Sequence, residues 1–449
     1  MSPLWGGAEL AAALGVERGW EIAGISIDTR TLVPGDLFVA LQGERDGHDF
    51  VEAAFAKGAA AALVAKPMPG NVIVVPDTLR ALERLGAAAR ARGEARIVAV
   101  TGSVGKTTVK EMLRRTLAAF GSVHAAEASF NNHIGVPLTL ARMPRDAAFG
   151  VFEIGMNHPG EIAPLAALVR PDVAIITCVD RAHLGLMGSE EAIAREKASI
   201  FAALVPGGTA VMPEETVFLP LLRDAVPAAC HAVVFGRKDG ADSHMPKRVM
   251  WADGSQIDAN IAGTEVSFGL ATPGLHMAMN ALAALSAAAA LGLDVQQAGA
   301  ALDGFVPYKG RGERQALTLA GGRKILLLDE SYNASGASMR AAFSVLKLQR
   351  GRRVAVLGDM LELGEHAAAE HLGLRSWAED GADILFACGP WSKVLFDSLP
   401  RSMQGAHAET AAALAPMVLA ALEDGDIVLV KGSYGSRMRD VISALESPG

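Results

Sequence analysis

The chain has 449 residues, 51% of them hydrophobic and 20% charged, so it is long enough for about three domains with large buried cores. Its net charge of −8 at pH 7 argues against a nucleic-acid-binding surface, so local groups must hold any anionic ligand. Three widely spaced cysteines and an N-terminus without a basic leader predict reduced thiols in a cytoplasmic protein.

Residues 1–90 mix short strands with alanine-rich helical segments, which predicts a small α/β domain. An alternating segment over 24–30 leads into the turn Pro34-Gly35-Asp36. The strands expected after this turn are 37–41, 62–65 and 72–75, and the expected helix is 50–58.

A glycine-rich turn follows the next apolar run, in the sequence Thr101-Gly-Ser-Val-Gly-Lys-Thr-Thr108. Gly102 and Gly105 allow backbone N–H groups to face an anion. Lys106 supplies a positive charge, and Thr107 offers a hydroxyl to Mg²⁺. These features predict a phosphate-binding loop for ATP.

The loop departs from the usual spacing at one position, because Val100 stands where the longer form has a further glycine. A helix is expected after the loop, since apolar residues recur at helical spacing until Gly121. These residues are Val109, Met112, Leu113, Thr116, Leu117 and Phe120.

Strands and helices alternate from Ile97 to about Val306, which predicts a doubly wound, mostly parallel sheet. The expected strands are 97–100, 150–154, 173–177 and 209–212, and the stretch 233–268 is expected to form an antiparallel extension. The apolar stretch 277–293 contains polar residues and falls short of a membrane span of about 20 residues. It therefore predicts a buried, alanine-rich helix and no membrane insertion.

Two polar residues lie at the ends of predicted strands, where open α/β sheets bind their ligands. Glu153 closes the strand 150–154, and His183 follows the strand 173–177. Together with Thr107 they would offer two oxygens and an imidazole to a hard cation. A lone glutamate or histidine in a loop more commonly bonds to backbone, but the neighbouring phosphate-binding loop favours the metal role.

Lys197 lies on the apolar face of a helix expected over 189–204, four residues after Ile193. A buried lysine is unfavourable unless it is paired or modified. Two explanations remain open. The side chain could extend along the helix edge to solvent, or it could be a catalytic-site lysine near Glu153 and His183.

Pro307 and the glycines of 310–312 predict a hinge, and a second series of strands and helices beyond it predicts a Rossmann-like domain. Its strands are 324–328, 353–357, 384–387 and 427–430, and it has no G-x-G-x-x-G, so no dinucleotide is expected. The polar segments Asp329–Ala334, Gly358-Asp359 and Lys431–Tyr434 follow three of these strands. We expect this rim to face the phosphate-binding loop across a cleft closed by domain motion.

Eight segments carry a resemblance to a known family: Thr101–Thr108, Asn131–Thr139, Glu153–Ile162, His183–Lys197, His276–Asn280, Gly310-Arg311, Leu328–Asn333 and Leu357–Gly364. Through them the chain resembles the Mur ligases over its full length. Two further segments, Ser26–Arg30 and Leu37–Gly43, resemble the family's uridine-nucleotide domain. We expect domain boundaries of 1–90 for UDP-substrate binding, 91–307 for the ATPase domain and 308–449 for the C-terminal ligase domain.

The resemblance implies an ATP-dependent, ADP-forming amide-bond ligase of cytoplasmic peptidoglycan precursor synthesis. ATP would phosphorylate the terminal carboxylate of a UDP-N-acetylmuramoyl tripeptide, and D-alanyl-D-alanine would attack the acyl phosphate. The implied catalytic residues are Lys106, Lys197 and His183, and the implied ATP-binding residues are Gly102, Ser103, Gly105, Lys106, Thr107, Thr108, Asn280, Arg311 and Asp329. The implied ligands of Mg²⁺, with two ions expected, are Thr107, Glu153, His183 and Lys197.

Lys197 matches a position that is carbamoylated in several members of the family, and whether this chain carbamoylates it is left open. A carbamate would turn a buried cation into an oxygen ligand. The substrate-binding residues implied by the resemblance are Ser26, Asp28, Arg30, Asn131, Asn132, Asn333 and Ser433.

The chain departs from the family pattern at two places. Ser335-Gly336 stands where the family usually has Asn-Pro, and Arg314 is close enough to Arg311 to leave the motif arginine ambiguous. The Asp-Asn-Pro-Arg motif of the diaminopimelate- or lysine-adding relatives is absent, which favours the dipeptide-adding branch. We expect a monomer.

Three alternatives remain. One is another ligase of the superfamily, such as a tripeptide-forming Mur enzyme or a folylpolyglutamate synthetase. A P-loop GTPase is disfavoured because the chain has no Asn-Lys-x-Asp tetrapeptide. A non-catalytic nucleotide-binding protein is disfavoured by Lys106, Glu153 and His183.

Overall fold

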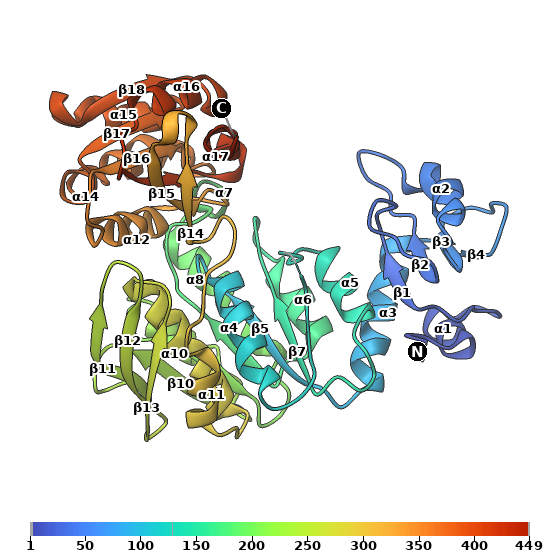
Figure 1. Ribbon diagram of the computed structural model, residues 1–449. Coiled ribbons are helices and arrows are strands. Elements are labelled where there is room, and N and C mark those ends of the chain that lie inside the picture. Colours follow the sequence, from blue (N-terminus) through green and yellow to red (C-terminus); the bar gives the residue numbers. More distant parts are fainter. Residues whose placement is uncertain (1–2, 128, 448–449) are drawn as a thin grey trace.

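The computed structural model describes residues 3–127 and 129–447, which form three α/β domains along the chain (Figure 1). The N-terminal domain contains a parallel sheet of four strands in chain order. Its elements are α1 (Gly7–Leu14), β1 (Gly24–Ser26), β2 (Asp36–Val39), α2 (Val51–Ala56), β3 (Ala61–Val64), β4 (Val72–Val74) and α3 (Thr78–Arg92). The three predicted strands are present as β2, β3 and β4, and the alternating segment 24–30 forms a strand only over β1. A 3₁₀ turn, Gly47–Phe50, precedes α2.

Helix α3 joins the N-terminal domain to the central domain. The carboxylate of Asp77 caps its start by accepting two N–H groups of the first turn, at 2.9 and 3.0 Å. The apolar face of α3 packs against α5 (Gly135–Ala141) of the central domain. The indole of Trp5 donates a hydrogen bond to the carbonyl of Ala141 at 2.9 Å. These contacts fix the N-terminal domain to the α5 side of the central domain.

The central domain is built on a nine-stranded sheet in the order β13-β12-β11-β10-β9-β8-β5-β7-β6. The seven strands from β6 to β11 in this order are parallel, which confirms the doubly wound core. Among the described strands of this sheet, the antiparallel pairings are β11 with β12 and β12 with β13, so the predicted extension begins later than residue 233. The strands are β5 (Arg96–Thr101), β6 (Val123–Ala125), β7 (Phe149–Glu153), β8 (Val173–Ile176), β9 (Thr209–Pro213), β10 (His231–Gly236), β11 (Ser243–Met250), β12 (Ser255–Ile261) and β13 (Thr264–Leu270).

Helices cover both faces of this sheet. They are α4 (Lys106–Ala118), α5, α6 (Ile162–Val169), α7 (Leu184–Met187), α8 (Glu190–Ala198), α9 (Leu219–Asp224), α10 (Leu275–Ala290) and α11 (Val295–Leu302). The helix predicted over 189–204 is α8 followed by a 3₁₀ segment, Ser199–Ala203. Within the described residues, no helix is long and apolar enough to cross a membrane.

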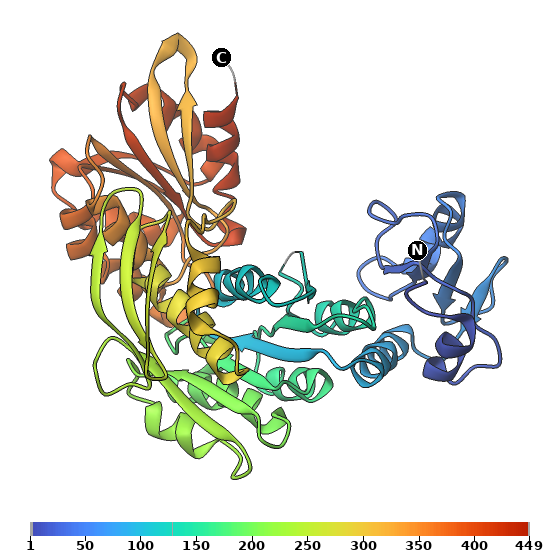
Figure 2. The ribbon, with the colours of Figure 1, turned by 60° about the horizontal axis from the view of Figure 1, so that its bottom comes forward.

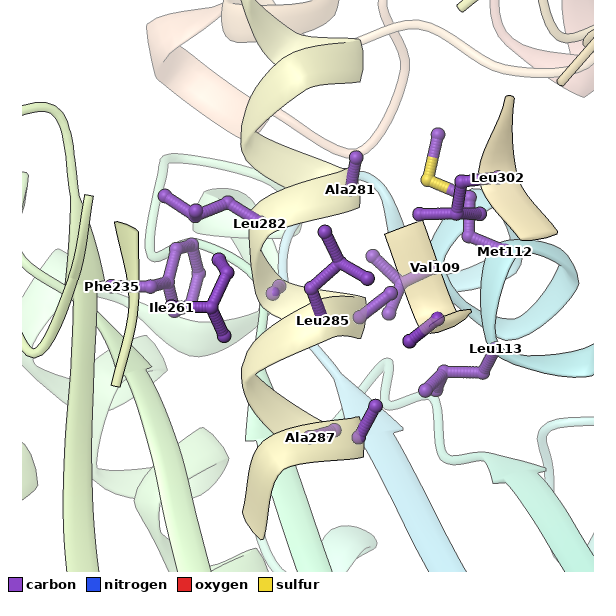
Figure 3. Close-up of a cluster of buried hydrophobic side chains, with 14 of the residues drawn as sticks. Val109, Met112, Leu113, Phe235, Ile261, Ala281, Leu282, Leu285, Ala287 and Leu302 are labelled. Atoms are coloured by element: carbon purple, nitrogen blue, oxygen red, sulfur yellow. The ribbon is translucent and has the colours of Figure 1, made fainter. Parts of the chain in front are cut away.

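Helix α10 is the predicted buried, alanine-rich helix, and it packs beside α4 and against strands β8 to β12. Leu282 lies beside Phe235 and Ile261 of the strands, and Leu285 lies toward Val109 of α4 (Figure 3). Alanines at most other positions of α10 allow close approach to these neighbours. Because α10 packs on α4, its first turns are held beside the start of α4, where the phosphate-binding loop ends.

The C-terminal domain has a six-stranded sheet in the order β14-β15-β19-β16-β17-β18, parallel except for β14. This confirms the predicted Rossmann-like domain. Its elements are β14 (Glu313–Thr318), β15 (Lys324–Glu330), α12 (Gly336–Lys347), β16 (Arg353–Gly358), α13 (Ala367–Leu372), α14 (Arg375–Gly381), β17 (Ile384–Cys388), α15 (Pro390–Ser398), β18 (Gln404–Ala408), α16 (Ala411–Ala421), β19 (Ile427–Lys431) and α17 (Arg439–Glu446).

Strands β6, β14 and β18 were not predicted, and each is an edge strand. Their residues are mostly half-buried or exposed, and β18 reads Gln-Gly-Ala-His-Ala. An edge strand of this kind lacks the continuous apolar run that marks a buried parallel strand.

The two end domains lie on different sides of the central domain. The N-terminal domain sits beside α3 and α5, and the C-terminal domain sits beside α7 and α8; the two are apart in both views (Figures 1 and 2). The loop between β8 and α8 therefore lies between the phosphate-binding loop and the C-terminal domain.

Candidate active site

The phosphate-binding loop lies where β5 ends and α4 begins, near the middle of the sheet. Gly102 and Gly105 have φ angles of 150° and 87°, which L side chains rarely adopt. A Cβ on Gly102 would overlap the hydroxyl of Thr177, and one on Gly105 would lie 2.5 Å from Oδ1 of Asn280. The structure therefore requires both glycines and places Asn280 beside the loop.

Hydrogen bonds fix the loop to the chain that follows β8. The hydroxyl of Thr177 donates to the carbonyl of Val104 at 2.5 Å, and the N–H of Ser103 donates to the carbonyl of Cys178 at 3.0 Å. The hydroxyl of Ser103 donates to the carbonyl of Asp180 at 2.8 Å and accepts from its N–H at 2.9 Å. Since the hydroxyl and the N–H of Ser103 both make hydrogen bonds within the protein, we expect an anion to contact the first-turn N–H groups of α4. The contact of Ser103 with ATP remains a prediction.

Lys106 is the first residue of α4, followed by the buried Thr107 and Thr108. Its Nζ donates to the carbonyl of Gly102 at 2.7 Å. Burial lowers the pKa of Lys106; Glu153 opposes this shift and Arg311 adds to it. A desolvated cation at the start of a helix is suited to a phosphate ligand.

Ser129 connects the phosphate-binding loop to the C-terminal domain. Its hydroxyl lies 3.3 Å from that of Thr107 and accepts a hydrogen bond from Arg311 at 3.1 Å. The Arg311 guanidinium lies 3.9 Å from the centre of the Tyr332 ring. Arg314 instead donates to a carbonyl of the β11–β12 turn at 2.7 Å. The geometry therefore places Arg311, and not Arg314, beside the loop.

Glu153 is buried at the end of β7, the neighbour of β5. Its Oε1 accepts from the amide of Asn131 at 2.7 Å. Its Oε2 is buried and has no hydrogen-bond partner among the described residues. Such an oxygen costs at least about 1–3 kcal/mol, which a bound cation would relieve.

The donor set therefore fits Mg²⁺, with Thr107 and Glu153 supplying oxygens next to a phosphate site. In the described part of the chain, no group of three or more His, Cys, Asp and Glu side chains is placed to hold a metal. Phosphate oxygens and water would have to complete the shell, as is usual for Mg²⁺. The individual ligands remain predictions.

His183 precedes α7 in a left-handed conformation, with φ of 64°. Its Nδ1 contacts the carboxylate of Glu362 in the C-terminal domain, and this hydrogen bond lowers the pKa of Glu362. A carboxylate on one ring nitrogen orients the other toward a ligand. A cation would therefore meet Nε2, and the metal role of His183 remains a prediction.

Lys197 is only 1% exposed, which excludes the explanation that it reaches solvent along the helix edge. Its Nζ lies 3.9 Å from Sδ of Met156. Burial lowers the pKa of Lys197 to about 7, and the charge of Lys106 adds to the shift. An amine that is partly neutral near pH 7 can act as a nucleophile, which a fully charged lysine cannot. Its catalytic role remains a prediction.

Asp329 is fully buried at the rim of the C-terminal sheet. Its Oδ2 accepts from the N–H of Gly310 at 3.0 Å, and its Oδ1 accepts from the N–H and the hydroxyl of Ser331 at 3.0 and 2.6 Å. Asp329 thereby holds the segment that carries Arg311. Its expected contact with the ribose remains a prediction.

Three other predicted substrate residues make hydrogen bonds within the fold. The hydroxyl of Ser433 accepts from the N–H of Leu361 at 2.9 Å. The carbonyl of Asn333 accepts from Nζ of Lys431 at 3.0 Å. The side chain of Asn132 accepts two N–H groups at the start of α5, at 3.2 and 2.9 Å. Their roles toward substrate remain predictions.

The predicted uridine residues lie together on the N-terminal domain. Ser26 ends β1, and the Asp28 carboxylate binds the exposed Arg30 guanidinium at 2.6 Å. This hydrogen bond lowers the pKa of Asp28. The structure thus groups Ser26, Asp28 and Arg30 in one turn, and it places them on a different domain from the phosphate-binding loop.

The sequence did not reveal the contacts between the β8–α8 loop and the C-terminal domain. The carboxylate of Asp180 accepts from the N–H of Ala337 in α12 at 3.1 Å and lies 3.5 Å from Arg340. Arg181 pairs with Glu370 at 2.7 Å. Asp180 also bonds to Ser103 of the phosphate-binding loop. It lies three residues before His183, which is the only signal that the sequence offered.

A phosphate-binding loop in a parallel sheet, approached by an arginine from a second α/β domain, defines a nucleotide-binding protein of the P-loop type. Three family descriptions match the chain: "Mur ligase family, catalytic domain" at residues 21–120, "Mur ligase middle domain" at 100–288, and "Mur ligase, glutamate ligase domain" at 313–434. The chain belongs to the Mur ligase family.

Relatives named UDP-N-acetylmuramoyl-tripeptide–D-alanyl-D-alanine ligase match nearly the whole chain. The Synechocystis sp. protein is 36% identical, over 94% of this chain and 92% of its own. The Escherichia coli protein is 36% identical, over 95% of this chain and 94% of its own. Among solved structures, MurF from Acinetobacter baumannii is 30% identical with a TM-score of 0.87, covering 98% of both chains. MurF ligase from Thermotoga maritima in complex with ADP is 26% identical with a TM-score of 0.80, covering 94% of this chain and 97% of its own.

Proposed function

We propose that this protein joins D-alanyl-D-alanine to a UDP-N-acetylmuramoyl tripeptide, with conversion of ATP to ADP and phosphate. The observation that carries the proposal is the contact of Arg311 with Ser129 beside Thr107, which brings the two domains' phosphate-binding groups together. The relatives named for this activity support the substrates, and the ADP complex of the Thermotoga maritima protein supports ATP. The reaction belongs to cytoplasmic peptidoglycan precursor synthesis.

The reaction has two steps. A carboxylate oxygen of the tripeptide attacks the γ-phosphorus, and the bond to the bridging oxygen breaks, so that ADP leaves with the electron pair. The dipeptide amine then attacks the acyl carbon, phosphate leaves, and the amine loses a proton. Lys106 and Arg311 neutralise charge on the transferring phosphoryl group, and the first-turn N–H groups of α4 orient it.

Mg²⁺ would be held by Thr107 and Glu153, and by His183 and Lys197 where a second ion binds. When bound, it would neutralise charge on the phosphate oxygens. The unpartnered Oε2 of Glu153 supports the first site. For Lys197, the buried position next to the charge of Lys106 supports a carbamate, which would replace a disfavoured cation with an anion.

We assign the parts of the reaction to three domains with boundaries 1–90, 91–307 and 308–449, and we propose a monomer. The N-terminal domain would bind the uridine nucleotide through the turn of Ser26, Asp28 and Arg30. Asn131, which holds Glu153, and Asn132 would lie toward the peptide. Asn333 and Ser433 lie on the rim that would receive the dipeptide.

D-alanyl-D-alanine is expected to support ATP turnover far better than any single amino acid. The acyl phosphate forms before the amine reacts, so the amine is selected in a pocket of its own. A pocket that pairs a second peptide unit leaves polar groups unsatisfied without that unit, which lowers the rate by several orders of magnitude. The measurement is phosphate release with UDP-muramoyl tripeptide, ATP and each acceptor in turn.

Diaminopimelate, lysine, glutamate and D-alanine alone are the comparison acceptors. A higher rate with one of the single amino acids would contradict the dipeptide assignment while leaving the ligase class intact. Phosphate release that needs no UDP-linked peptide would contradict both.

A further inference from the structure

The hydroxyl of Tyr308 is a buried polar group that the proposed reaction has not used. Tyr308 lies in the linker between α11 and β14, and its carbonyl accepts from the N–H of Arg311 at 3.0 Å. Its Oη is buried and has no hydrogen-bond partner among the residues that the structure describes. Buried hydroxyls in folded proteins nearly always have a partner, so this one calls for an explanation.

Tyr308 lies near the phosphate-binding loop, because its turn also carries Arg311, whose guanidinium donates to Ser129 beside Thr107. Burial is the largest cause that raises the pKa of Tyr308, Arg311 opposes the shift, and Glu111 and Glu153 add to it. The hydroxyl therefore stays protonated at neutral pH and is available as a donor. The charges of Arg311 and Glu153 also shift the pKa of Lys106.

Within the described part of the chain, this donor has no hydrogen-bond acceptor. The carboxylate of Glu111 is engaged by Lys110 and Arg114, at 3.0 and 2.7 Å. Glu153 uses Oε1 for Asn131, and its Oε2 is itself without a partner among the described residues. Among the described residues, one donor and one acceptor are thus both unsatisfied, and the charges of Glu153 and Arg311 act on the donor. This is the arrangement expected where a ligand completes the site.

We propose that Tyr308 binds a ligand of the reaction cleft, its hydroxyl donating a hydrogen bond to an anionic oxygen. This inference rests on the proposed function, which supplies two sources of such an oxygen: the phosphates of ATP and the carboxylate of the UDP-linked peptide. Because Tyr308 and Arg311 belong to one turn, we expect a ligand that binds Arg311 to contact Tyr308 as well.

The substitution Tyr308→Phe tests this directly, since it removes the hydroxyl and keeps the ring. In the free protein the hydroxyl has no hydrogen-bond partner among the described residues, so the variant should melt at the same temperature as the native protein or higher. With ligand, the variant should lose one hydrogen bond to a charged group. We expect kcat/KM to fall about 10- to 100-fold, together with a smaller thermal stabilisation by the ligand concerned.

The two sources are separated by measuring that stabilisation with Mg²⁺·ADP alone, with Mg²⁺·ATP alone and with the UDP-linked tripeptide alone. A smaller shift with ADP or ATP assigns the bond to the phosphates, and a smaller shift with the peptide assigns it to the carboxylate. Thr116→Val is the matched control, because the Thr116 hydroxyl on α4 is also buried and unpartnered within the described residues. That variant should keep the native rate and all ligand shifts.

A Tyr308→Phe protein that melts lower but keeps every ligand shift would show a structural role and overturn the inference. Unchanged rates and shifts would overturn it as well, and so would a slower rate with every shift intact. Each of these outcomes counts against the inference alone, provided that the native protein releases phosphate with UDP-linked tripeptide and dipeptide. Failure of the native protein in that assay would instead contradict the proposed function.

Discussion

Lys106→Ala is expected to reduce ATP-dependent phosphate release by about a thousand-fold, the scale of loss for groups that stabilise a transferring phosphoryl group. Lys106 begins α4 at the phosphate-binding loop, where burial lowers its pKa and the charges of Glu153 and Arg311 act on it. Its Nζ makes one hydrogen bond to the loop, so its loss should shift the melting temperature little. Phosphate release and thermal melting measure both effects.

Arg114→Ala is the control for Lys106→Ala. Arg114 is a cation on the same helix, but it is solvent-exposed and pairs with Glu111 at 2.7 Å. Its loss should leave the rate within a few-fold of native, as expected for an exposed ion pair. A folded Lys106→Ala protein with the native rate would remove the phosphate-binding role of the loop.

Lys197 substitutions are expected to be nearly as damaging, with activity falling by about two orders of magnitude or more, if the lysine supplies a metal-binding carbamate. In that reaction the neutral amine attacks CO₂, forming an N–C bond, and the carbamic acid releases a proton. Millimolar formate or acetate should then partly restore Lys197→Ala, because a small carboxylate can occupy the vacated oxygen position.

Lys197→Met separates this role from a structural one. Methionine keeps most of the apolar volume and removes a buried amine whose Nζ lies 3.9 Å from the sulfur of Met156. The variant should melt at the native temperature or higher, since an apolar side chain avoids burying a charge, yet should be inactive. Full activity of either variant would return Lys197 to a structural role.

The strand, loop and helix around Lys106 could be predicted because every signal is local. Gly102, Gly105 and the apolar spacing after Lys106 lie within about twenty consecutive residues. Periodicity also placed Lys197 on an apolar face. The periodicity could not show whether the Lys197 side chain is buried or reaches solvent, because that depends on how α8 packs beside Met156.

The contacts that join the domains could not be predicted, because they pair residues far apart in the chain. The hydrogen bonds between Ser129 and Arg311 and between Glu362 and His183 form only after the sheets of the central and C-terminal domains have formed and docked. The unpartnered hydroxyl of Tyr308 is likewise invisible in the sequence, since a lack of partners is a property of the packed structure.

The most direct test of the central claim follows the oxygen atoms of the substrate carboxylate. The protein is supplied with ATP, Mg²⁺, D-alanyl-D-alanine and UDP-muramoyl tripeptide carrying ¹⁸O in its terminal carboxylate, and the phosphate and peptide products are weighed by mass spectrometry. If the carboxylate is phosphorylated and then joined to the dipeptide amine, each phosphate carries one ¹⁸O, and one pentapeptide product forms for each phosphate. Unlabelled phosphate, released without a pentapeptide product, would contradict the account, because water and not the carboxylate would then have attacked ATP.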